Sequence, residues 1–314
     1  MRIIPALAEH FAFRFGGLEL MQRWLDAQPF LSDPKNDQIV ELHAILSVLK
    51  PISTNQSQAR IQQTREVLGG HGYSRFNMIG GWRNDNDINI TWEGDNTVLI
   101  QQAARFIAKS LEKKMKGKEI KHKSLAFLAK FEETSNAKMQ INSQADLQNL
   151  DNLISMLEFR VNLLLQKSVG RLAEKIGTKK SSFEAWNDTQ VFYLQNMARA
   201  WGELYVFNCF KEKINSITDS PTKKVLVKLL CLFALVQLER DMVYLRENDF
   251  IGSDACDMIR NEIIDLNDHL KDHIVTIIDA ISPPDEIIGA PLGHSDGKVN
   301  WIFYYFLKIL FFVF

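Results

Sequence analysis

The amino-acid sequence predicts an all-α protein made of two consecutive helical bundles. Apolar residues recur at three- and four-residue steps along most of the chain, which is the spacing that lines one face of an α-helix. No stretch shows the apolar-polar alternation that is typical of a half-buried strand. Beyond residue 145, four long segments of helical spacing follow one another with short breaks, and this pattern favours an antiparallel bundle.

The composition is that of a globular protein without a global charge bias. The chain has 314 residues, of which 46% are hydrophobic, and this is enough to form sizeable cores. It carries 37 Lys and Arg against 38 Asp and Glu, so its net charge of -1 provides no field that would attract nucleic acid. Cys209, Cys231 and Cys256 are widely spaced, and we expect buried thiols rather than disulfides or a metal site.

The first bundle is predicted over residues 1–115. The opening stretch is typical of an amphipathic helix rather than of a signal peptide, because polar residues interrupt it and no cleavage site follows. A turn, FLSDPKND, precedes a second helix that Pro51 is expected to kink or break and that ends at Gly69. Residues 70–95 lack a period and are predicted to be loop, and a helical period returns at Leu99. The apolar face expected on the first helix comprises Ile4, Leu7, Phe11, Leu18, Met21 and Leu25.

A second bundle is predicted over residues 145–297, after a linker at 116–144. The stretch near residues 112–125 is rich in lysine and glycine, which indicates an exposed connection. The four helices of this bundle are expected to begin near Leu147, Ser182, Thr222 and Ser253. Residues 298–314 form an atypical apolar tail, which is too short to cross a membrane because a spanning helix needs about 20 apolar residues. The tail also lacks the basic face of an interfacial anchor.

The glycine-rich segment LGGHG, residues 68–72, is the first candidate for a binding site. Its simplest interpretation is a helix C-terminus followed by a flexible loop. Glycines also let a backbone approach a ligand closely and offer it amide donors. His71 has no second titrating residue nearby in the sequence, so we do not assign it a role as acid or base.

The segment WEGDN, residues 92–96, is the second candidate. An acidic residue in the opening turn of a helix ordinarily complements the helix dipole. Glu93, however, stands between Trp92 and Gly94, and glycine is unfavourable in a helix. We therefore expect its carboxylate on a tight turn beside aromatic surface, desolvated enough to abstract a proton.

The polar segment RNDND, residues 83–87, lies between the two candidates. It is interpreted either as a solvated turn with local ion pairs or as a hydrogen-bonded scaffold around the site. The sequence contains no HExxH, GxSxG or Walker motif, and no GxGxxG in a strand context. This excludes the common hydrolase, NTPase and dinucleotide-fold interpretations.

Three segments, in their order and spacing, resemble the C-terminal helical region of peroxisomal acyl-CoA oxidases, namely REVLGGHGY, RNDND and WEGDNTVLIQQAARF. The likeness is closest to the branched-chain or pristanoyl type. The segment IDAISPPDEIIGAPLGHSDG, residues 278–297, is similar to the terminal helical domain of the same family. The likeness spans most of residues 1–300. It implies a four-helix domain of acyl-CoA dehydrogenase type over 1–115 and the oxidase-specific helical domain over 145–297.

The resemblance also implies an activity, which is the conversion of acyl-CoA and oxygen to trans-2-enoyl-CoA and hydrogen peroxide in fatty-acid β-oxidation. Glu93 would remove the α proton while hydride passes to FAD, and Gly94 would lie beside the thioester. The resemblance implies an FAD bound largely by a neighbouring subunit, hence a homodimer. The residues that would contact the cofactor are Leu68, Gly69, Gly70, His71, Gly72, Asp95 and Asn96.

Two alternatives concern the reaction and the extent of the chain. Acyl-CoA dehydrogenases share the glutamate of the EG pair, but most end soon after the next helix, whereas this sequence continues into a second bundle. Members of the oxidase family have an N-terminal helical domain and a middle β domain before the matched region, so the resemblance predicts a fragment. An inactive remnant, or a truncated subunit that pairs with a full-length one, is therefore the alternative to an active oxidase.

The expected location follows from the same resemblance. The family is peroxisomal, but this sequence ends in KVNWIFYYFLKILFFVF rather than in the Ser-Lys-Leu type ending that the import receptor reads. A cytoplasmic location is therefore the alternative to the peroxisome.

Overall fold

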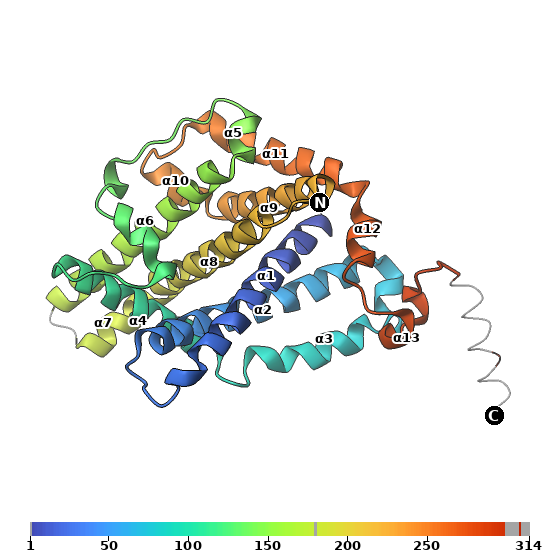
Figure 1. Cartoon of the computed structure of the whole chain (residues 1–314), viewed down its shortest axis with the longest axis horizontal. Helices are drawn as coiled ribbons and strands as arrows, with labels where there is room; N and C mark the ends of the chain where they lie inside the picture. Colours follow the sequence, from blue (N-terminus) through green and yellow to red (C-terminus); the bar gives the residue numbers. More distant parts are fainter. Residues whose placement is uncertain (1, 179–180, 299–307, 309–314) are drawn as a thin grey trace. The chain divides into compact units, whose positions relative to one another are not determined.

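A computed structural model describes residues 2–178, 181–298 and 308 of the chain (Figure 1). These residues form helices and turns and no strand, which confirms the all-α prediction. No helix among them is long and apolar enough to cross a membrane. The predictions for the apolar tail fall on residues that, apart from 298 and 308, lie outside the described part of the chain.

Most helices follow one another with short connections, and a longer one that contains the 3-10 turns Lys123–Lys130 and Thr134–Asn136 joins α4 to α5. Short 3-10 turns lie between several of them, and the π-helical turn Gln190–Leu194 joins α7 to α8. The α-helices are α1 (Ile4–Ala27), α2 (Asp37–Val67), α3 (Ile79–Asp87), α4 (Asn96–Met115), α5 (Gln144–Gln148), α6 (Leu150–Gly177), α7 (Ser182–Thr189), α8 (Gln195–Asn215), α9 (Ser220–Arg240), α10 (Met242–Glu247), α11 (Ser253–Lys271), α12 (Ile274–Asp279) and α13 (Asp285–Ile288).

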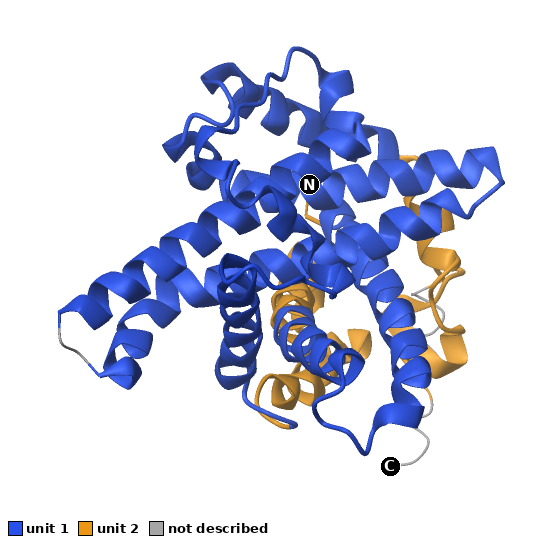
Figure 2. Ribbon diagram, turned by 60° about the vertical axis from the view of Figure 1, so that its left-hand side comes forward, with its two compact units in different colours: residues 1, 3–53, 93–271 blue, residues 2, 54–92, 272–314 orange. Residues whose placement is uncertain are grey.

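Contacts between residues divide the chain into two compact units, which Figure 2 colours separately. Unit 1 comprises residues 1, 3–53 and 93–271, and unit 2 comprises residues 2, 54–92 and 272–314. In unit 1, α8 packs against α1, α4, α6 and α9, and α11 packs against α9. In unit 2, the turn Arg75–Asn77 packs against the turn Pro291–Gly293. In unit 1, helices that precede residues 116–144 contact helices that follow them. These contacts do not test the predicted domain limits 1–115 and 145–297, which stay a prediction.

Helix α1 buries a face of mostly small residues, which agrees with the predicted face at Ile4 and differs from it farther along the helix. Ala8, Ala12 and Gly16 are buried, and a Cβ atom at Gly16 would lie 2.7 Å from Cγ1 of Val206 on α8. Small side chains let the two helix backbones approach closely. Aromatic side chains add to this packing, since the rings of Phe15 and Phe210 on α8 lie 4.7 Å apart and Phe11 also stacks on Phe210. The larger residues that the sequence pattern placed on the buried face are partly exposed, namely Leu18, Met21 and Leu25.

Helix α2 continues through Pro51, so of the two predicted outcomes the break is wrong and the kink stays a prediction. A proline inside a helix costs about 3 kcal/mol because it removes a hydrogen bond and crowds the preceding turn. Val48, Leu49 and Ile52 around it are buried, and burying each such side chain contributes about 1.5 to 3 kcal/mol. A Cβ atom at Gly202 would lie 2.8 Å from side-chain atoms of Val48 and Ile52, so close packing against α8 holds this part of α2 helical.

The loop predicted over residues 70–95 contains a helix, α3, which is a correction to the sequence interpretation. The segment RNDND forms its second half and is tied to α2 within unit 2. The Gln58 amide donates to Oδ1 of Asp87 at 2.8 Å, and the Asn86 amide donates to Oε1 of Gln58 at 2.9 Å. Polar side-chain contacts of this kind leave no apolar period in the sequence, which is why the helix was missed.

A buried charge network links α6, α8 and α9. The side chains of Arg160 and Glu203 are fully buried, and Nη2 of Arg160 lies 2.9 Å from Oε2 of Glu203. Arg240 donates to Glu203 at 2.8 Å, and both Arg160 and Arg199 lie 3.0 Å from the carboxylate of Asp241. Helix α9 ends at its C-cap Asp241, which leaves helical geometry and whose carboxylate pairs with the arginines. Three guanidinium groups thus share two carboxylates.

We expect Glu203→Gln to lower the free energy of unfolding by about 3 to 5 kcal/mol, because it leaves buried guanidinium charge uncompensated. Urea unfolding followed by circular dichroism measures this. The control is Arg171→Ala in the exposed Arg171–Glu174 pair, which should unfold close to wild type. Equal midpoints for Glu203→Gln and wild type would show that the network does not stabilise the fold.

Candidate functional site

Glu93 stands at a turn that leads directly into α4. Glu93 has φ +54° and Gly94 has φ +100°, so two consecutive residues adopt left-handed backbone geometry. A non-glycine residue in this region costs on the order of 1 kcal/mol, and such residues cluster at functional sites. A Cβ atom at position 94 would lie 3.0 Å from the Leu99 side chain, so the turn also requires glycine for space. The tight turn expected from the sequence is therefore present.

The surroundings of Glu93 differ from those expected. Glu93, Gly94 and Asp95 are all exposed in this chain, so the expected desolvated carboxylate is not seen. An exposed carboxylate at a fixed turn can reach a ligand, but its desolvation has to come from whatever binds over it.

Asp95 and Asn96 have structural contacts of their own. Oδ1 of Asp95 accepts hydrogen bonds from the backbone amides of Thr97 at 2.8 Å and Val98 at 3.3 Å, which makes Asp95 the N-cap of α4. Asn96 is buried, and its amide donates to the carbonyl of Pro51 at 3.5 Å. Their predicted contact with a cofactor stays a prediction, while the capping role of Asp95 accounts for its position in the sequence.

Lys50 is a residue of this site that the sequence analysis missed. Its ammonium group donates to the carbonyl of Gly94 at 2.7 Å and to Oδ1 of Asn96 at 2.8 Å. Lys50 precedes Gly94 by 44 positions, and it lies on α2 beside Pro51. No local motif signals this contact, because it depends on the packing of α2 against the start of α4 within unit 1.

The segment Leu68–Gly72 ends α2 and continues as the 3-10 turn Gly69–Tyr73, in unit 2. Gly69 has φ +56°, as expected for a glycine that stops a helix. Leu68, Gly69, Gly70 and His71 are exposed, and a Cβ atom added at either of the first two glycines would meet no atom within 4 Å. This backbone is therefore open to a ligand.

Gly72 differs from the other two glycines of this segment. It is buried, and a Cβ atom there would lie 1.8 Å from the carbonyl oxygen of Arg65. Nε of Arg65 donates to the carbonyl of Gly72 at 3.1 Å, and its guanidinium lies 4.4 Å from the centre of the Tyr73 ring. The amide of Asn77 donates to the carbonyl of His71. These contacts fix the turn from within unit 2.

The structure thus groups the predicted residues into two sets. Glu93, Gly94, Asp95 and Asn96 lie together with Lys50 in unit 1, and Leu68–Gly72 lie together in unit 2. Across residues 2–178, 181–298 and 308, no cluster of His, Cys, Asp and Glu is suited to hold a metal ion.

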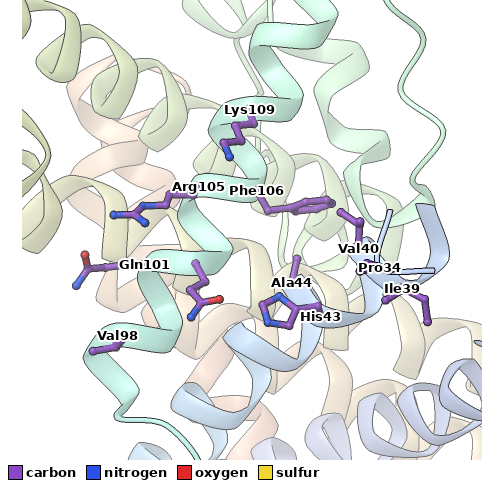
Figure 3. A pocket seen from close by; sticks show the side chains of 11 residues that line it. Pro34, Ile39, Val40, His43, Ala44, Val98, Gln101, Arg105, Phe106 and Lys109 are labelled. Atoms are coloured by element: carbon purple, nitrogen blue, oxygen red, sulfur yellow. The ribbon is translucent and has the colours of Figure 1, made fainter. Parts of the chain in front are cut away.

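A pocket of about 530 Å³ between α2 and α4 contains none of the predicted site residues (Figure 3). Figure 3 shows Phe106 and Val40 pointing toward one another, whereas Arg105 points away from α2. The pocket therefore does not enlarge the candidate site.

We expect Asp95→Ala to lower the free energy of unfolding by about 1 kcal/mol, since it removes an N-cap. Asp95→Ser keeps a capping oxygen and should retain most of that stability. Thermal unfolding of both variants measures the difference. If Ala and Ser unfold at the same temperature, the side chain of Asp95 does not cap α4 in solution.

Comparisons with known proteins match nearly the whole chain. The protein-family model of the acyl-CoA oxidase C-alpha1 domain matches residues 1–108, and the protein-family model of acyl-CoA oxidase matches residues 149–300. Human peroxisomal acyl-coenzyme A oxidase 3 is 33% identical over 266 residues, which are 82% of this chain and 38% of the human protein. The chain therefore spans less than half the length of this relative.

Solved structures of acyl-CoA oxidases share the fold of this chain. An acyl-CoA oxidase from Yarrowia lipolytica superposes with a TM-score of 0.85 at 26% identity, over 97% of this chain and 44% of that one. Acyl-CoA oxidase-1 from Caenorhabditis elegans, crystallised with FAD and ATP, superposes with a TM-score of 0.87 at 24% identity, over 98% of this chain and 46% of that one. The matches to two protein-family models of acyl-CoA oxidases, together with the fold shared with a solved oxidase, show that the chain belongs to the acyl-CoA oxidase family.

Proposed function

We propose that this chain carries the catalytic base of an FAD-dependent acyl-CoA oxidase, which converts acyl-CoA and oxygen to trans-2-enoyl-CoA and hydrogen peroxide. The observation that carries the proposal is the position of Glu93. Glu93 has an exposed carboxylate, and Glu93 and Gly94 both adopt left-handed backbone geometry directly before the capped helix α4. This turn occurs in a chain of the acyl-CoA oxidase family. Because strained backbone of this kind has to be fixed by its surroundings, its presence supports a functional turn.

The proposed role of Glu93 is to take the α proton of the acyl thioester. That proton is only weakly acidic, so the carboxylate must be aimed at it and shielded from water when the substrate is bound. Gly94 has no side chain, and its exposed backbone lets a thioester lie beside the turn. A single base is sufficient for this step, and the other carboxylate of the site, Asp95, caps α4.

The turn Leu68–Gly72 has the properties that contact with FAD requires. Its two open glycines and its exposed backbone leave room for a flat cofactor, and the internal contacts of Gly72 keep the turn in shape. When bound, FAD accepts the hydride from the β carbon and passes electrons to oxygen. The related enzyme from Caenorhabditis elegans was crystallised with FAD. We propose that the segment contacts a flavin held largely by a neighbouring subunit in a homodimer.

The same family membership supports proposals for substrate and location. Relatives from human and rat are named peroxisomal acyl-coenzyme A oxidases. A structure similar to this chain was solved with an ascaroside-CoA. We propose a coenzyme A thioester as the substrate class and the peroxisome as the location.

Glu93→Gln is expected to lower peroxide formation at least about 100-fold while FAD stays bound, because it removes only the base. The variant is measured in human peroxisomal acyl-coenzyme A oxidase 3 whose matching region has been replaced by residues 1–298. The control is Glu112→Gln, which changes an exposed glutamate of α4. Activity of Glu93→Gln close to that of the parent chimera would contradict the proposed base.

The same chimera separates the alternatives. Flavin reduction by acyl-CoA with release of peroxide in air supports an oxidase, whereas a flavin that acyl-CoA reduces but that only an added electron acceptor reoxidises indicates a dehydrogenase. A chimera that binds FAD but is not reduced by any acyl-CoA favours the non-enzymatic alternative.

Gly72→Ala is expected to lower the flavin content of the purified chimera, because the added methyl group collides with the Arg65 carbonyl and displaces the turn. Gly81→Ala, on α3 and outside the proposed flavin contact, is the matched control, since its methyl group enters open space and should leave the flavin content near that of the parent. Flavin absorbance relative to protein absorbance measures both. Equal flavin content in the two variants would exclude a role for the shape of this turn in cofactor binding.

A further inference from the structure

Lys50 connects the middle of α2 to the turn that carries Glu93. Its ammonium donates to the carbonyl of Gly94 at 2.7 Å and to the side-chain oxygen of Asn96 at 2.8 Å. The Asn96 amide donates in return to the carbonyl of Pro51 at 3.5 Å. Neighbouring residues of α2 therefore contact both ends of the segment from Gly94 to Asn96.

The chemistry of these contacts favours a cation at position 50. Hydrogen bonds from an ammonium group are shorter and roughly twice as strong as those between neutral groups. Lys50 is half-buried, and the Gly94 carbonyl and Asn96 side chain are neutral acceptors, so its charge strengthens these two hydrogen bonds at once.

The turn needs an outside contact because its backbone is strained. Glu93 adopts φ +54°, which an ordinary residue holds only when its neighbours fix it. Asp95 anchors the end of the turn on α4, because its side chain caps that helix. Lys50 restrains the carbonyl of Gly94 from a different helix, so the turn is held from both sides.

We propose that Lys50 is a positioning residue, which fixes the orientation of the Glu93 carboxylate through the carbonyl of Gly94 and the side chain of Asn96. The proposal rests on the proposed role of Glu93 as the base. Lys50 acts through the backbone of the turn and needs no contact with the substrate. It is distinct from the capping residue Asp95, which acts on the helix that follows.

The first test is hydrogen exchange of the 314-residue chain with Lys50→Met, which keeps the length of the side chain and removes its charge. We expect the amides of Thr97 and Val98, which are hydrogen-bonded to Asp95, to exchange at least about tenfold faster, since the loss of two charge-assisted hydrogen bonds loosens the turn before them. Amides in the buried parts of α8 and α9 should be unchanged, which shows that the fold is intact. Lys109→Met, an exposed lysine of α4, is the control and should leave Thr97 and Val98 unchanged. Unchanged exchange of these residues in Lys50→Met would overturn the proposal.

The second test is turnover in the chimera with human acyl-coenzyme A oxidase 3. Lys50→Met should lower kcat at least about tenfold, with KM and flavin content close to those of the parent, because a misaligned base affects the chemical step. A kcat within twofold of the parent would overturn the proposal even if exchange at the turn rises. The proposed function is judged separately: it fails if Glu93→Gln keeps its activity, and the exchange result then still reports whether Lys50 fixes the turn.

Discussion

Close packing against α8 is the constraint on which unit 1 depends. Gly16 lets α1 approach this helix, and Gly202, on α8 itself, makes room for α2 at Val48 and Ile52. The same helix carries Glu203, whose buried carboxylate collects guanidinium groups from α6, α8 and α9. Small residues thus allow the close spacing of the helices, and the charge network joins α6, α8 and α9 by ion pairs. Neither device relies on large apolar side chains, although such residues fill the rest of the core.

This packing also determines where the candidate base lies. Pressed against α8, α2 stays helical through Pro51 despite the loss of a hydrogen bond, and Lys50 is thereby placed at the start of α4. A break at Pro51 would free Lys50 from that position. The left-handed turn at Glu93 is then stabilised by a helix that packing keeps continuous through Pro51. The geometry of the site is in this sense a product of the core of unit 1.

The sequence was sufficient for the fold class, for most helix positions and for the residues that carry a recognisable motif. Glu93, Gly94 and the glycines at 69–72 could be identified because their order and spacing are particular. The buried face of α1 could not, since a hydrophobic pattern ranks Leu18 and Met21 above Ala8 and Gly16. Helix α3 was missed because amide contacts with Gln58, rather than apolar periodicity, stabilise it. Lys50 was missed because a contact between residues 44 positions apart leaves no local signal.

The contact between Gly72 and Arg65 bears on how sequences of this family are compared. A glycine within a binding motif is commonly taken to be there for the ligand. At position 72 the neighbouring carbonyl already excludes every other side chain, with or without a cofactor. Natural selection for a stable turn alone would keep this glycine, including in a copy of the gene that had lost its activity. Gly70, which faces open space, has no such internal reason to persist, so it is the more informative position for deciding whether a relative still binds flavin.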